Sequence, residues 1–157
     1  MGIYSIEFRT ILTIFETLYL GGLKMAYTYD KTLETGHTLI DSQHKELIAA
    51  INSLMEACNQ GKGREETKKT IAFLKNYTDK HFGDEEVLQQ KYNYPDIVNH
   101  KKLHQTFKDD VKAISEDFDK NGTSVALTFK VNNIAAWFIN HIKIQDKKVA
   151  AHINSQK

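Results

Sequence analysis

Five histidines and two carboxylates recur along this 157-residue chain at intervals that suit metal binding. His81 and Glu85 are four residues apart, so on a helix both side chains share one face. His100 and His104 have the same interval and can share a face of another helix. The full set of candidate ligands is His44, His81, Glu85, His100, His104, His141 and Asp146.

The types and number of these ligands limit which metal ions and which kinds of metal site the chain could form. Imidazole and carboxylate suit iron, manganese, zinc or nickel. Seven ligands exceed the four of a tetrahedral zinc site, so the set predicts two ions that share bridging carboxylates. Cys58 is the only cysteine, which excludes an iron–sulfur cluster, a cysteine-based zinc site and an internal disulfide.

Long helices must position these side chains. The chain has one proline, Pro95, and its apolar residues recur at helical spacing without sustained strand alternation. The pattern predicts an all-α, up-down-up-down antiparallel four-helix bundle with the metal site in its core. Asp41 or Ser42 would cap the first helix. The predicted helices cover residues 41–60, 65–91, 95–118 and 124–153, and the inward residues of the last are Ile134, Trp137, Phe138, His141 and Ile144.

The predicted turns bisect the ligand pairs. Antiparallel helices rise equally per residue, so two residues equally far from a turn lie at one level. The turn at 61–63 lies midway between His44 and His81, and the turn at 121–123 lies midway between His104 and His141. The turn at 92–94 lies midway between His81 and His104, so all four histidines share one level. Glu85, His100 and Asp146 then form a second level about one helical turn away.

Burying so many titratable groups without a metal would cost several kcal/mol for each unpaired charge, which favours a metal site over an ordinary core. His37 and His152 do not fit either level and are predicted to be ordinary surface residues. Cys58 falls near the first turn and is predicted to be inert.

Composition and charge predict partners and compartment. The chain is 41% hydrophobic and 26% charged, with a net charge of +1 and well-mixed signs. This composition is typical of a soluble globular domain and indicates neither a nucleic-acid nor a membrane partner. A lone cysteine fits a reducing, cytoplasmic location.

The N-terminal segment has two interpretations. Residues 1–24 carry an apolar run, from Ile11 to Leu20, that is too short to span a bilayer and lacks the features of a secretory signal. We favour translation starting at Met25, which leaves residues 25–157 as the domain; the alternative is an N-terminal helix or arm that packs on it.

Four segments resemble the bacterial hemerythrin family. Residues 36–45 (GHTLIDSQHK) are similar to its N-terminal signature with the core Ile-Asp-x-Gln-His-Lys. Residues 81–86 (HFGDEE), 100–104 (HKKLH) and 141–146 (HIKIQD) resemble its H-x-x-x-E, H-x-x-x-H and H-x-x-x-x-D segments. All seven ligand positions are matched, over about residues 27–152, whereas residues 1–24 have no counterpart.

The resemblance implies a role for each ligand. His100, His104 and His141 would complete one iron. His44 and His81 would hold a second iron and leave it an open position. Glu85 and Asp146 would bridge the two irons together with an oxo or hydroxo group.

The resemblance also implies reversible binding of dioxygen, for storage, delivery, scavenging or sensing, rather than enzymatic activity. A di-iron peroxidase, oxidase or nitric-oxide reductase and iron sequestration are the alternatives. Five neutral imidazoles and two carboxylates stabilise high-valent iron less than the carboxylate-rich sites of oxygenases, which favours release of intact oxygen. An apolar pocket would protect the bound oxygen. The expected pocket residues are Leu47, Phe82, Trp137 and Ile142. The protein is expected to be a monomer or a small homo-oligomer.

Overall fold

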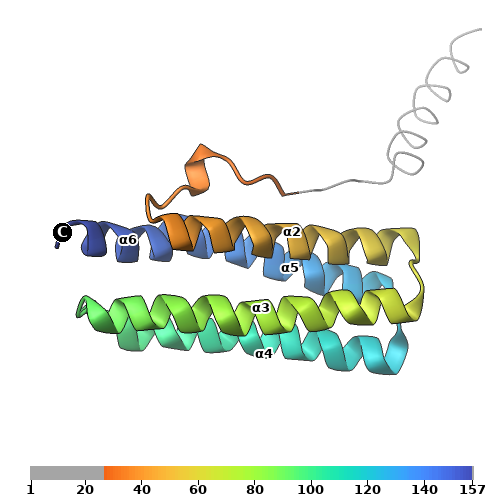
Figure 1. Cartoon of the computed structure of the whole chain (residues 1–157). Helices are drawn as coiled ribbons and strands as arrows, with labels where there is room; N and C mark the ends of the chain where they lie inside the picture. The colour runs from red at the N-terminus through yellow and green to blue at the C-terminus, as the bar shows by residue number, and fades with distance from the viewer. Residues whose placement is uncertain (1–26, 157) are drawn as a thin grey trace, which may run out of the picture.

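The computed structural model describes residues 27–156, and the interpretations of residues 1–24 lie outside this part of the chain. Four helical columns lie side by side and alternate in direction, which confirms the predicted up-down-up-down bundle (Figure 1). Helix α2 packs against α3 and α5, and α4 packs against the same two helices, which closes the bundle. The elements are the 3-10 turn η1 (Lys31–Leu33), α2 (Thr38–Gln60), α3 (Arg64–Lys91), α4 (Ile97–Asn121), α5 (Val125–His141), the π-helical segment η2 (Ile142–Asp146) and α6 (Lys147–Asn154).

The predicted turns lie where the helices end. Gly61 ends α2 with a φ of 61°, a left-handed conformation that costs glycine little. Ser124 begins α5, and its side chain accepts a hydrogen bond from the amide of Leu127 at 3.0 Å. This bond satisfies one of the amides that a helix start leaves free. These two turns therefore arise from local chemistry, as the sequence predicts.

The predicted starts of two helices are wrong by a few residues. Helix α2 begins at Thr38, and Asp41 is already helical, so it does not cap the helix. The Asp41 carboxylate instead accepts hydrogen bonds from Thr35 at 2.8 Å and from the amide of Gly36 at 3.1 Å, and so ties down the preceding loop. Helix α4 begins at Ile97, and Pro95 lies in the turn before it.

The last column is not one regular α-helix. Between α5 and α6 the chain forms the π-helical segment η2, which accommodates one extra residue in its turn. The extra residue changes which side chains face the core at the end of this turn. Ile144, predicted to face inward, is 49% exposed, whereas Asp146 is fully buried.

The bundle interior is apolar, and the ligand candidates lie within it. The other predicted inward residues of the last column, Ile134 and Phe138, are buried, and Trp137 is half-buried against the core.

The segment before α2 is anchored to this helix, since the side chain of Asn52 exchanges two hydrogen bonds with the backbone of Tyr27. Within residues 27–156, the helices are too short or too polar for any of them to cross a bilayer.

Candidate metal centre

All seven predicted ligands lie together in the bundle core, and none is more than 4% exposed. Helix α2 contributes one of them, α3 and α4 contribute two each, and the last residues of α5 and η2 contribute one each. The ring centroids of His44 and His81 are 4.9 Å apart, and those of His104 and His141 are 5.2 Å apart. The pairs predicted to share a level are therefore neighbours.

Asp146 lies between histidines from three columns. Its Oδ2 is 3.0 Å from Nε2 of His44 on α2. Its Oδ1 is 3.0 Å from Nε2 of His141 and 3.4 Å from Nε2 of His100. One oxygen thus lies beside a histidine of α2 and the other beside histidines of α4 and α5, an arrangement suited to a carboxylate that two ions share.

Glu85 has a similar position on α3. Its Oε1 is 3.2 Å from Nε2 of His100, and its Oε2 is 3.6 Å from Nε2 of His104 and 3.9 Å from Nε2 of His81. Gln89, one turn further along α3, donates a hydrogen bond to Oε1 at 3.1 Å and orients the carboxylate.

The described residues offer two groups of converging ligand atoms, and Asp146 belongs to both. The first group comprises His100, His104, His141 and Asp146, and the second comprises His44, His81 and Asp146. Within each group the candidate ligand atoms lie within 4.8 Å of one another. The two groups are unequal, with four residues in one and three in the other.

The orphaned polar atoms of the core fit two metal ions. The Nε2 atoms of all five histidines are buried and form no well-aligned hydrogen bond, although carboxylate oxygens lie close to them. Both oxygens of Asp146 and Oε2 of Glu85 are in the same condition. Buried polar atoms are normally satisfied, so eight such atoms facing one centre point to cations as the missing partners.

The electrostatics of the centre have identifiable causes. Burial and the proximity of His44 lower the pKa of His81 to about 3, which keeps this ring neutral and able to coordinate. Burial and Asp146 oppose ionisation of Glu85, but the nearby His100 and His104 outweigh them and lower its pKa to about 2. Burial opposes protonation of His100, but the two carboxylates outweigh it and raise its pKa to about 9. The two carboxylates thus favour a positive charge at this position in the metal-free protein.

The comparisons with known proteins agree with this geometry. Residues 35–153 match the model of the hemerythrin HHE cation binding domain. The chain belongs to the hemerythrin family. It is 35% identical over 114 residues to a bacteriohemerythrin of Pseudomonas aeruginosa strain LESB58, covering 73% of this chain and 72% of the relative. It is 28% identical to a myohemerythrin of Theromyzon tessulatum, covering 78% of this chain and 89% of the relative. A crystal structure of wild-type hemerythrin superposes with a TM-score of 0.73 at 26% identity, covering 81% of this chain and 97% of that one.

Aromatic rings enclose the centre of this hemerythrin-family chain. Phe82 stacks on His104 with ring centroids 3.8 Å apart, and Trp137 stacks on His141 at 4.6 Å. The rings of Phe138 and His44 form a T-shaped pair with centroids 5.5 Å apart. The other two expected pocket residues, Leu47 and Ile142, are fully buried in the hydrophobic core that also contains Phe82 and Phe138. The sequence predicts Phe138 only as a core residue, because nothing in its spacing separates a ring that packs on a ligand from one that packs elsewhere.

Two polar neighbours of the ligands are not predicted by spacing. Gln43 lies 3.0 Å from Nδ1 of His81, and Glu86 lies 3.0 Å from Nδ1 of His104. Each is adjacent in sequence to a ligand, and Gln43 is also part of the N-terminal signature at residues 36–45; these are the signals that could have indicated them.

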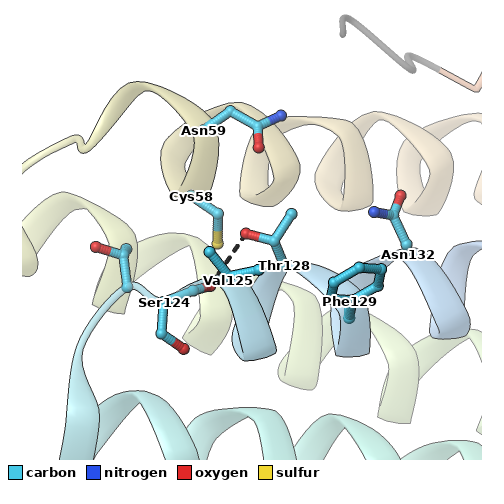
Figure 2. A pocket seen from close by; sticks show the side chains of 8 residues that line it. Cys58, Asn59, Ser124, Val125, Thr128, Phe129 and Asn132 are labelled. Carbon is cyan, nitrogen blue, oxygen red and sulfur yellow. Dashed lines mark hydrogen bonds between the residues drawn. The ribbon is translucent and has the colours of Figure 1, made fainter. Parts of the chain in front are cut away.

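Glu85 belongs to neither of the two groups, although it lies beside them, and His37, His152 and Cys58 also lie outside them. His37 precedes α2, and His152 is half-buried in α6, where its Nε2 donates to the carbonyl oxygen of Tyr92 at 2.8 Å. His152 is therefore a structural residue rather than an ordinary surface one. Cys58 lines a surface groove between the end of α2 and the start of α5 (Figure 2). In this groove the hydroxyl of Thr128 donates a hydrogen bond to the carbonyl oxygen of Ser124. Burial raises the pKa of this thiol, which reduces its reactivity.

Proposed function

We propose that this hemerythrin-family protein binds dioxygen reversibly at a pair of iron ions. The observation that carries the proposal is the unequal division of the ligands around one shared carboxylate, Asp146. A group of four residues and a group of three, both including Asp146, are suited to one fully ligated ion and one with a free position. Dioxygen needs a free position if it is to bind without displacing a protein ligand.

The proposed ligand assignment corresponds to the two groups. His100, His104 and His141 would hold one iron, and His44 and His81 would hold the other. Glu85 and Asp146 would bridge the pair. The close approach of Asp146 to histidines of both groups supports its bridging role, and the position of Glu85 between His81 and His104 supports the second bridge.

A ferrous pair would supply the two electrons that dioxygen takes up on binding and returns on release. The protein's part is to keep this exchange reversible. The proposed pocket residues would place apolar side chains around the centre, which would limit access for water, anions and external proton donors. Leu47, Phe82 and Ile142 are completely buried, and Trp137 covers one face of His141. The half-buried, solitary thiol of Cys58 is consistent with our further proposal of a cytoplasmic location.

The test is an anaerobic reconstitution with two ferrous ions per chain, followed by exposure to air and then removal of the oxygen. We expect a visible charge-transfer band that appears with air and disappears on deaeration. Irreversible conversion to a diferric spectrum would contradict reversible binding and favour an enzyme. Uptake of many irons per chain would instead indicate iron sequestration.

A further inference from the structure

The outer nitrogen of His104 faces a carboxylate. Glu86 Oε1 lies 3.0 Å from Nδ1 of His104, and Lys101 Nζ lies 3.3 Å from the other oxygen of Glu86. Glu86 is 23% exposed, whereas His104 is 1% exposed, so the carboxylate is at the boundary between solvent and core. A carboxylate paired with a lysine accepts hydrogen bonds, so Nδ1 of His104 donates.

The outer nitrogen of His81 faces a neutral amide. Gln43 Oε1 lies 3.0 Å from Nδ1 of His81, and Gln43 Nε2 donates to Asp84 Oδ2 at 2.6 Å. Lys80 pairs with the same oxygen of Asp84 at 2.9 Å. The carboxylate of Asp84 is an acceptor, so the amide must direct its nitrogen to Asp84 and its oxygen to His81.

Both contacts therefore select the same tautomer. With the hydrogen on Nδ1, the Nε2 lone pairs of His81 and His104 are directed into the centre, where a metal ion would lie. The two contacts differ in charge, because Glu86 is a carboxylate and Gln43 is an amide. A carboxylate that accepts the hydrogen bond from Nδ1 of a ligating imidazole makes Nε2 a stronger electron-pair donor to the metal. Such outer contacts commonly change metal affinity by 10- to 100-fold.

We propose that Glu86 is a positioning residue that makes the metal position of His100, His104 and His141 the tighter of the two, so that it is loaded first. The His44 and His81 position, where Gln43 offers a neutral amide and Nδ1 of His44 has no hydrogen-bond partner among the described residues, is loaded second. This inference rests on the two-metal site of the proposed function. It predicts that the two positions can be weakened separately through residues that touch no metal.

The test uses anaerobic titration of the metal-free protein with Co²⁺, followed by visible absorption and competition with a chelator. Wild type should bind two Co²⁺ in two steps. His44→Ala, which removes a ligand from the weaker position, should retain the first step and lose the second. These results would assign the two steps to the two groups of ligands.

The decisive variants change the outer contacts. Glu86→Gln keeps an acceptor but removes the charge, and it should weaken the first step about tenfold while the second changes less than about twofold. Glu86→Leu removes charge and acceptor and should weaken the first step further, toward about 100-fold. Gln43→Leu should weaken the second step alone. The matched control is Glu116→Gln, which removes a carboxylate paired with Lys112 on the surface of α4 and should leave both steps unchanged.

Two results would overturn the inference while leaving the two-metal site intact. One is wild-type affinity for both steps in Glu86→Gln. The other is equal weakening of both steps in Glu86→Gln and Glu86→Leu, since a general structural role would produce it. Failure of the wild type to bind two Co²⁺ would instead refute the two-metal site itself.

Discussion

Phe82 is the side chain whose removal should most clearly separate packing from protection of the metal centre. Its ring stacks on His104 at a centroid distance of 3.8 Å and an interplanar angle of 6°, and it also contacts His81 and Phe107. Phe82→Ala removes six buried carbon atoms, which at about 0.8 kcal/mol for each methylene-sized group amounts to roughly 4–5 kcal/mol. This value agrees with the typical cost of Phe-to-Ala changes in cores, about 3–5 kcal/mol.

The matched variant Phe82→Leu removes three carbon atoms and should lower the free energy of unfolding by about 2 kcal/mol. Urea denaturation of the metal-free proteins measures both values. The melting temperature of Phe82→Ala should be lower than that of the wild type by roughly 6–20 °C, because each kcal/mol of lost stability lowers it by about 2–4 °C. In the iron-loaded proteins, Phe82→Ala should shorten the lifetime of the oxygenated form more than Phe82→Leu, because only alanine leaves space for water beside His104. A decrease of less than about 1 kcal/mol in the free energy of unfolding of Phe82→Ala would refute the packing argument. Equal lifetimes of the oxygenated form in the wild type and both variants would refute the protective role.

Two further predictions concern the bridges and the pocket. Glu85→Ala and Asp146→Ala should each reduce the iron bound per chain, measured by metal analysis, while circular dichroism shows unchanged helical content; two irons retained in both variants would exclude their bridging roles. Leu47→Ala and Trp137→Ala should each speed autoxidation to the diferric form, monitored by visible absorption, because each opens the apolar surroundings of the centre; a wild-type rate in both would restrict these residues to packing.

Much of the fold and the location of the centre could be predicted because both depend on spacing. Glycine and proline mark the turns, and helices of constant rise place residues equidistant from a turn at one level. His44 and His81 are neighbours for this reason, although 36 residues separate them in the chain. The inward positions of Ile134 and Phe138 can be derived in the same way from helical periodicity.

Features that depend on side-chain competition could not be predicted from spacing. Asp41 could serve either as a helix cap or as an acceptor for the preceding loop, and only the path of that loop decides between them. Gln43 and Glu86 carry ordinary surface residue types, and their contacts with His81 and His104 depend on rotamers and on the neighbouring charges of Asp84 and Lys101. Propensity describes an average residue and does not contain this information.

The five-residue interval between His141 and Asp146 shows how a local irregularity serves the centre. In a regular α-helix the residue that shares the face of His141 is four positions on, which is Gln145, and a five-residue interval turns Asp146 well away from that face. The π-helical turn η2 adds the residue that brings Asp146 back to the core, where its two oxygens reach His44 and His141 at 3.0 Å each. Because Asp146 belongs to both ligand groups, an α-helical turn that pointed it elsewhere would remove a ligand from each. The irregular turn therefore has two consequences: Asp146 lies between the two ligand groups, and Ile144 is exposed.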